Sequence, residues 1–169
     1  NNFFYTGFSY GGHAALRLMK DLEFGDKRKW AGIVSLEPPC NIFHKPRNFI
    51  TPILVLKGGE SHYGPKPCKT MIDLYASAGA DASLKIFPKS NHFFSHNGKI
   101  VKGVAFNGCG DNPVIIGIDN SLRFLDGSQA NPKIVRKKCF TKTAGSGKSR
   151  EDLKLAINAS IEFFKLKLN

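Results

Sequence analysis

One short run near the amino terminus constrains the fold of this 169-residue chain more than any other stretch, namely Gly7-Phe-Ser-Tyr-Gly-Gly12. Apolar residues precede the run as in a buried strand, and apolar residues at helical spacing follow it. Ser9 is therefore predicted to occupy a sharp turn between a strand and a helix, in a strained backbone conformation. Small residues two positions before and two positions after the serine let the two elements approach each other, and Gly7 and Gly11 are predicted to serve in this way.

A turn of this kind would present the Ser9 hydroxyl as a nucleophile. The turn lifts the hydroxyl clear of the sheet, next to a helix amino terminus whose free N–H groups and positive dipole end favour a developing negative charge. A strand, a G-x-S-x-G turn and a helix in this order are typical of a nucleophile elbow. The additional Gly12 would allow the helix to pack tightly on the sheet.

The segments after the elbow alternate between strand-like and helix-like patterns. Strands are predicted at 30–36, 51–56 and 83–87, and helices at 68–78 and 150–168. The short apolar run at 30–36 is expected to be a strand buried on both faces, as in a parallel sheet. This order predicts an α/β fold with a mostly parallel sheet and flanking helices.

The segment from about 95 to 149 interrupts this pattern. It is rich in glycine, asparagine, aspartate and lysine, and so long a stretch without clear elements is expected to be a functional excursion or poorly ordered. Gly145-Ser-Gly-Lys-Ser149 is similar to a phosphate-binding loop, but the first glycine and the preceding strand that such a loop needs are missing. Residues 1–169 are therefore expected to form one domain with an irregular excursion and a closing helix.

The net charge of +12 raises the possibility of nucleic-acid binding. The basic residues are spread along the chain, with one dense group at 133–142, so a solvated basic surface is favoured over a nucleic-acid site. No apolar stretch is long enough to span a membrane, and no membrane partner is expected. No signal segment is recognised, so the location is left open between cytoplasm and periplasm, and the oligomeric state is open as well.

The cysteines give a weaker signal. There are four, and they form no C-x-x-C pair, which argues against zinc sites and redox motifs. Cys109 and Cys139 lie in the same irregular segment and could pair in an oxidising compartment. The sequence does not decide this.

A serine hydroxyl becomes a good nucleophile only when a neighbouring base removes its proton. His92 is the strongest candidate for this base because it closely follows the last strand before the irregular segment, and Phe93 and Phe94 could exclude water from it. Ligands of parallel sheets bind at the carboxyl ends of the strands, so Ser9 and His92 are expected to share one edge of the sheet. The other histidines are weaker candidates, because one lies on the elbow helix and the rest follow no strand so directly: His13, His44, His62 and His96.

Several motifs together resemble the dienelactone hydrolase family of α/β-hydrolases. They are Gly7–Gly12, Ser35–Cys40, Pro52–Gly59, Pro65 with Cys68, and Phe87–Phe94, so the resemblance covers roughly residues 3 to 94 plus the closing helix. It implies a partial α/β-hydrolase fold and an enzyme that cleaves a small-molecule ester or lactone through an acyl-enzyme, without metal or cofactor. It places Ser9 as the nucleophile, His92 as the general base, and the backbone N–H of Tyr10 in the oxyanion hole.

The acid that would orient His92 is left open by the sequence. The family usually carries it in a Gly-x-x-Asp run after the penultimate strand, and Ser61 occupies that place here. Glu37, at the end of the preceding strand, is the preferred alternative because some α/β-hydrolases carry their acid there. Glu60 is the second alternative, and the third is that neither carboxylate serves.

The resemblance also leaves part of the fold unaccounted for. A complete α/β-hydrolase has several strands before its elbow, and the loop after an early strand supplies a second oxyanion donor. Here the elbow strand opens the chain, so the amino-terminal strands are expected to be missing and the chain to be the carboxyl-terminal portion of a longer protein. Two other functions remain open: a prolyl-oligopeptidase-like serine peptidase, which also suits the Gly-x-Ser-Tyr-Gly-Gly run, and a catalytically inactive binding or scaffold module of the same fold.

Overall fold

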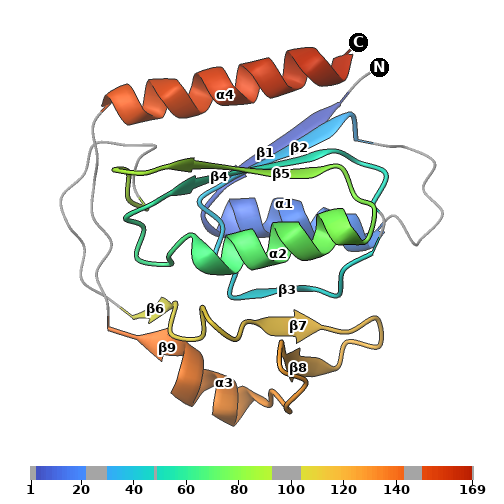
Figure 1. The fold of residues 1–169 in the computed structure, drawn as a ribbon, viewed down its shortest axis with the longest axis vertical. Helices are drawn as coiled ribbons and strands as arrows, with labels where there is room; N and C mark the ends of the chain where they lie inside the picture. Colours follow the sequence, from blue (N-terminus) through green and yellow to red (C-terminus); the bar gives the residue numbers. More distant parts are fainter. Residues whose placement is uncertain (1–2, 22–29, 48, 93–103, 143–149, 169) are drawn as a thin grey trace.

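A parallel sheet of four strands lies at the centre of the molecule (Figure 1). Its order is β1-β2-β4-β5, with β1 at Phe4–Phe8, β2 at Gly32–Leu36, β4 at Ile53–Gly58 and β5 at Ala82–Phe87. The computed structural model of the chain describes residues 3–21, 30–47, 49–92, 104–142 and 150–168. Because all neighbouring strands are parallel, their carboxyl ends meet at one edge of the sheet.

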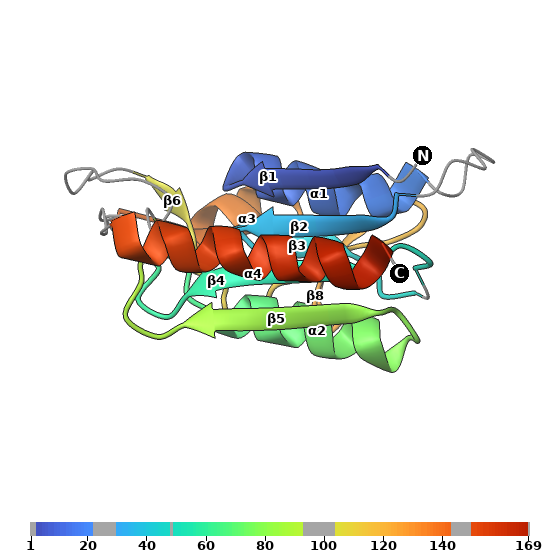
Figure 2. The ribbon, with the colours of Figure 1, turned by 90° about the horizontal axis from the view of Figure 1, so that it is seen from above.

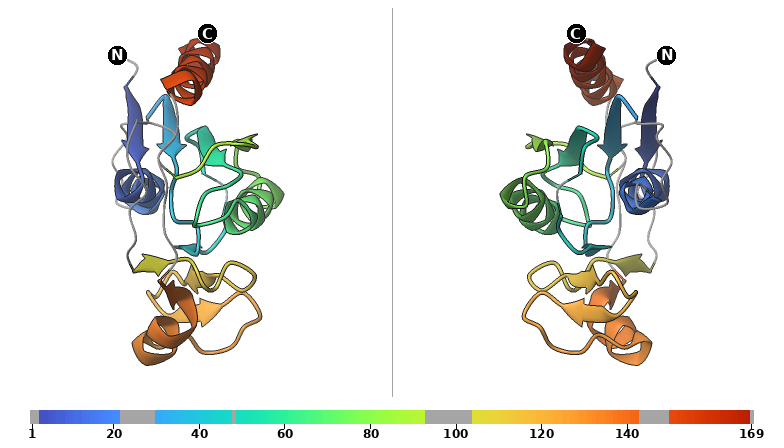
Figure 3. Two further views of the ribbon diagram at one scale, coloured as in Figure 1. Left: turned by 90° about the vertical axis from the view of Figure 1, so that its left-hand side faces the viewer. Right: turned by 90° about the vertical axis from the view of Figure 1, so that its right-hand side faces the viewer.

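Helices cover both faces of this sheet (Figures 2 and 3). Helices α1 (Tyr10–Asp21) and α2 (Lys66–Ser77) lie on one face, and α4 (Arg150–Leu168) lies on the other. The central strand β4 alternates between the two sides: Ile53 and Val55 pack with α1 and α2, whereas Leu54 and Leu56 pack with α4. This confirms the expected mostly parallel sheet with strands buried on both faces.

The predicted elements agree with the structure to within about two residues at each end. The strands and helices expected at 30–36, 51–56, 68–78, 83–87 and 150–168 correspond to β2, β4, α2, β5 and α4. The strand β3 (Ile42–His44) was not expected, because it has only three residues and shows no alternation of its own. It pairs in parallel with β7, far along the chain, so its existence depends on a tertiary contact.

Residues 104–142, expected to be irregular, contain further strands and a helix. These are β6 (Ala105–Phe106), β7 (Val114–Ile116), β8 (Leu122–Phe124), α3 (Pro132–Cys139) and β9 (Phe140–Thr141). Their strands have two or three residues each, too few for a readable period. Helix α3 did carry a start signal, since Asn131 Oδ1 accepts a hydrogen bond from the Ile134 N–H at 2.9 Å and Pro132 follows it. Residues 93–103 and 143–149 lie outside the described ranges, and they include the run at 145–149 that is similar to a phosphate-binding loop.

All four cysteines are paired in disulfides. Cys40–Cys68 joins the loop after β2 to the first turn of α2, and Cys109–Cys139 lies within the small core of the 104–142 segment. The second pair was considered from the sequence and the first was not. Disulfides persist mainly in oxidising compartments such as the bacterial periplasm.

Within the described ranges, no helix combines the length and the apolar character needed to cross a membrane.

Candidate active site

Ser9 forms the turn between β1 and α1. It is the single residue between Phe8, which ends the strand, and Tyr10, which begins the helix. Its φ of 55° lies in the left-handed region, which costs a non-glycine residue of order 1–3 kcal/mol. The backbone holds it there, since the Ser9 N–H donates to the Leu36 carbonyl at 2.8 Å and the Ser9 carbonyl accepts from the His13 N–H at 2.9 Å.

The close approach of strand and helix at this turn depends on Gly7 and Gly12. A Cβ on Gly7 would lie 2.2 Å from the Gly11 carbonyl oxygen, and one on Gly12 would lie 2.8 Å from the Leu36 carbonyl oxygen. A Cβ on Gly11 would meet no atom within 4 Å, so the expectation that Gly11 must be small is wrong. Its position in the first turn of α1 leaves its Cα facing open space, whereas Gly12 faces the neighbouring strand β2.

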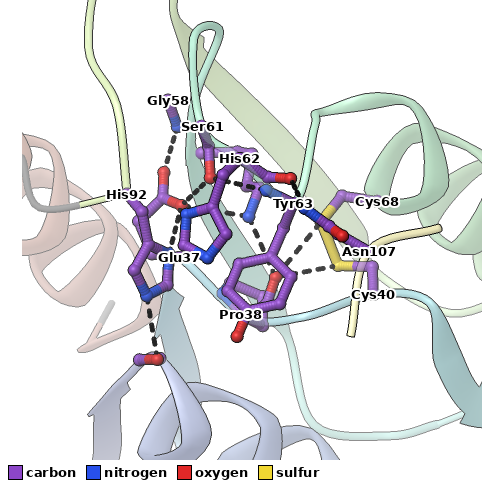
Figure 4. A network of polar contacts seen from close by, with 12 residues as sticks. Glu37, Pro38, Cys40, Gly58, Ser61, His62, Tyr63, Cys68, His92 and Asn107 are labelled. Atoms are coloured by element: carbon purple, nitrogen blue, oxygen red, sulfur yellow. Dashed lines mark hydrogen bonds and ion pairs between the residues drawn. A yellow bond between two sulfur atoms is a disulfide. The ribbon is translucent and has the colours of Figure 1, made fainter. Parts of the chain in front are cut away.

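The structure brings Ser9, His92 and Glu37 into one chain of hydrogen bonds. Figure 4 shows the His92 and Glu37 side chains of this chain together with the residues around Glu37. Ser9 Oγ lies 3.0 Å from His92 Nε2, and His92 Nδ1 lies 3.2 Å from Glu37 Oε2. An ionised carboxylate can only accept, so Nδ1 carries the ring proton and Nε2 of the neutral ring is left as an acceptor facing the serine. This tautomer is the one that can take the proton of Ser9.

Glu37 is the acid that contacts His92. It follows β2 directly, has a φ of 52° and is fully buried. Its Oε2 accepts from Lys57 Nζ at 3.0 Å and from Ser61 Oγ at 2.8 Å besides His92, and its Oε1 accepts from the Gly58 N–H. Burial would raise the pKa of Glu37, but the charge of Lys57 and the hydrogen bonds from His92 and Gly58 outweigh it and lower that pKa, so the carboxylate stays ionised.

Lys57 and Ser61 were not recognised as site residues from the sequence. Lys57 lies on β4 and is fully buried, and its ammonium also donates to the Pro38 carbonyl at 3.1 Å, next to Glu37. Burial lowers the pKa of Lys57, while the charge of Glu37 opposes this. Ser61 had been interpreted as a serine that replaces the acid. In the structure, Ser61 donates to Glu37, which follows the neighbouring strand β2, so Lys57 and Ser61 both hold Glu37 in place.

Glu60, the alternative acid, lies elsewhere. It is exposed in the turn after β4, where its backbone N–H donates to the Ser90 carbonyl at 2.8 Å. Tyr10 begins α1, so its backbone N–H belongs to the first turn of the helix, whose N–H groups have no partner inside the helix. That is the position required of an oxyanion donor next to Ser9.

Aromatic rings surround His92. The ring centroids of Phe8, His62 and Tyr63 lie 5.5, 4.7 and 4.8 Å from that of His92, and the His92 side chain is almost fully buried. These rings provide the apolar wall that had been expected from Phe93 and Phe94, which lie outside the described residues. His13 and His44 are placed on α1 and β3, and His96 also lies outside the described ranges.

His62 should make the protein less stable as the pH falls. Burial, followed by the charges of His92 and Lys57, lowers the pKa of His62 from 6.5 to about 4. Between these values the unfolded chain binds a proton at this ring that the folded protein does not, so the free energy of unfolding falls as the pH is lowered from about 6.5 to about 4. Melting temperatures measured across this window should fall less steeply in His62→Phe, which keeps an aromatic ring. Equal slopes in both proteins would contradict this.

The described residues offer no metal centre, because no group of three or more histidine, cysteine, aspartate or glutamate side chains in them is arranged to hold an ion.

In comparisons with known proteins, the chain matches no family model, no curated protein and no solved structure. The arrangement of Ser9, His92 and Glu37 is therefore the observation on which a function has to be argued.

Proposed function

We propose that this chain carries the active site of a serine hydrolase that cleaves a small ester or lactone through an acyl-enzyme on Ser9. The observation that carries the proposal is the hydrogen-bond chain from Ser9 Oγ to His92 Nε2 at 3.0 Å and from His92 Nδ1 to Glu37 at 3.2 Å. Nucleophile, base and orienting acid are the three parts that serine catalysis needs. They come from three separate strand ends, so the sheet and not a local motif brings them together.

The reaction follows from the protonation states. Ser9 Oγ attacks the ester carbonyl carbon and its proton passes to His92 Nε2, while Glu37 stabilises the imidazolium that forms. The negative oxygen of the tetrahedral intermediate is stabilised at the start of α1, where the Tyr10 N–H donates. Collapse of the intermediate breaks the bond to the alcohol, which takes the proton from Nε2. His92 then removes a proton from water, which hydrolyses the acyl-enzyme and restores Ser9.

The arrangement of the sheet supports a partial α/β-hydrolase fold, with the acid after β2 and not after β4, where the dienelactone hydrolase family usually carries it. In that fold the nucleophile, the acid and the histidine follow one another along the chain and all lie at the carboxyl ends of parallel strands. Ser9 follows β1, Glu37 follows β2 and His92 closely follows β5. The left-handed conformation of Ser9 and the contact between Gly7 and the start of α1 are the local features of a nucleophile elbow.

Labelling with a fluorophosphonate probe tests the proposal. The folded protein should form one covalent adduct, mapped by mass spectrometry to Ser9, and His92→Ala should abolish it. Ser77→Ala is the matched control, because Ser77 is exposed on α2, outside the hydrogen-bonded network, and its loss should leave labelling unchanged. An unlabelled protein that circular dichroism shows to be folded would overturn the proposal in favour of an inactive module. Cleavage of peptides but not of esters would favour a peptidase.

A further inference from the structure

A cavity of about 430 Å³ lies beside the elbow and has no part in the hydrogen-bonded network. Its volume falls in the range of about 300–1,000 Å³ that is usual for small-molecule sites. The wall is mainly apolar and comes from two parts of the chain: Tyr10, Pro39 and Ile42 on one side, and Phe106, Val135 and Phe140 on the other. A larger cavity of about 700 Å³, between α2 and the β7–β8 hairpin, is lined by no residue of the Ser9 network.

The cavity and the candidate active site share Tyr10. This residue lines the cavity, directly follows Ser9 in the chain, and shares a hydrogen bond with the Tyr63 side chain, which packs on His92. Tyr10 is thus a residue that a group attached to the carbonyl carbon at Ser9 would have to pass to reach the cavity.

The far wall belongs to the 104–142 segment and is held firmly. Strands β6 and β9 pair with each other, the rings of Phe106 and Phe140 lie 5.2 Å apart, and the Cys109–Cys139 disulfide ties the turn after β6 to the end of α3. The segment thus supplies an apolar surface opposite the start of α1.

The chemistry of the lining residues decides what the cavity would accept. Burial, and then the charge of Arg17, lowers the pKa of His13, so its ring is neutral near neutral pH. Among the described residues that line the cavity, Arg136 is the one with a permanent charge, and its side chain is exposed. An apolar group would therefore enter without losing contacts between water and a buried charge.

The direction of proton transfer decides whether the acyl half or the alcohol half of an ester lies in the cavity. The leaving alcohol oxygen must face His92 Nε2 to receive its proton, so the alcohol lies on the His92 side. His92 does not line the cavity, whereas Tyr10 and His13 of α1 do. We propose that the cavity is the acyl pocket of the hydrolase and that the enzyme prefers esters with an apolar acyl group longer than acetyl. This inference rests on the function proposed above.

A series of p-nitrophenyl esters from acetate to octanoate tests the inference. Each methylene that enters the cavity should raise kcat/KM by about fourfold, until the cavity is full. Val135→Trp, which fills the cavity from α3, should lower kcat/KM for the hexanoate at least about tenfold more than for the acetate. Lys137→Trp, on the exposed side of the same helix, should change neither.

A second variant tests the same inference if Val135→Trp does not fold. Phe140→Ala removes a half-exposed ring from the cavity wall and should shift the optimum to longer acyl chains. A flat chain-length profile in the unmodified protein, or equal losses for acetate and hexanoate in Val135→Trp, would overturn the acyl pocket. Fluorophosphonate labelling of Ser9 separates the two proposals. A labelled protein with a flat chain-length profile would contradict only the acyl pocket, whereas a folded protein that is not labelled would contradict the proposed hydrolase function as well.

Discussion

Glu37→Gln introduced into a Lys57→Met protein should lower kcat for an ester substrate about 10⁴-fold relative to Lys57→Met alone. A glutamine amide donates where the carboxylate accepted, so His92 Nδ1 would have to accept and Nε2 would carry the proton. Nε2 could then no longer take the proton of Ser9. The measurement is steady-state hydrolysis of a p-nitrophenyl ester, with the fold checked by circular dichroism.

The Lys57→Met background is what makes this experiment clear. In Glu37→Gln alone, the Lys57 ammonium would be left buried without its carboxylate, and lost activity could simply report lost structure. In the double variant, the glutamine and methionine side chains are both neutral and close in size to the native pair. Glu60→Gln is the matched control for the other candidate acid and should keep nearly full activity. A Glu37→Gln/Lys57→Met protein as active as Lys57→Met would remove Glu37 from the mechanism.

Breaking the buried ion pair should destabilise the protein by about 3–5 kcal/mol in either single variant, Glu37→Gln or Lys57→Met. The Glu37 and Lys57 side chains are 3.0 Å apart and both are fully buried, so each depends on the other to remain charged inside the core. Urea unfolding gives the free energies. The double variant should lose less than the sum of the single losses, by at least about 2 kcal/mol.

A lysine outside this network supplies the control for these unfolding measurements. Lys85 lies on the neighbouring strand β5 but is exposed, and Lys85→Met should change the free energy of unfolding by no more than about 0.5 kcal/mol. Strictly additive losses at Glu37 and Lys57 would show that the pair does not act as a unit.

The sequence was most informative where a pattern is set by several residues at once. The elbow, the apolar strands and the closing helix follow from periodicity and from glycine spacing, and they appear in the structure close to the expected bounds. His92 could be proposed as the base because a histidine soon after a parallel strand is expected at the same edge of the sheet as Ser9. For the acid, the sequence could only narrow the choice to Glu37, Glu60 or none.

The rest depended on contacts that no local pattern encodes. Lys57 looks like the polar end of a strand, and only the packing of β4 between β2 and β5 buries it beside Glu37. The short strands of 104–142 exist because they pair with each other and with β3, and the Cys109–Cys139 disulfide holds them together. Gly11 and Gly12 are chemically identical in the sequence, and only the position of Leu36 shows which of them must lack a side chain.

The pairing of β1 with β2 places Phe8 opposite Leu36, so Ser9 and Glu37 are the next residues on two adjacent strands. Both take the same left-handed conformation, and the amide of each continues the ladder by one further hydrogen bond, to Leu36 and Leu56 respectively. The distance between nucleophile and acid is thus a strand-to-strand spacing rather than a property of two loops. Thermal loosening of the surrounding turns would leave that distance intact, and it would be lost only when the sheet itself comes apart.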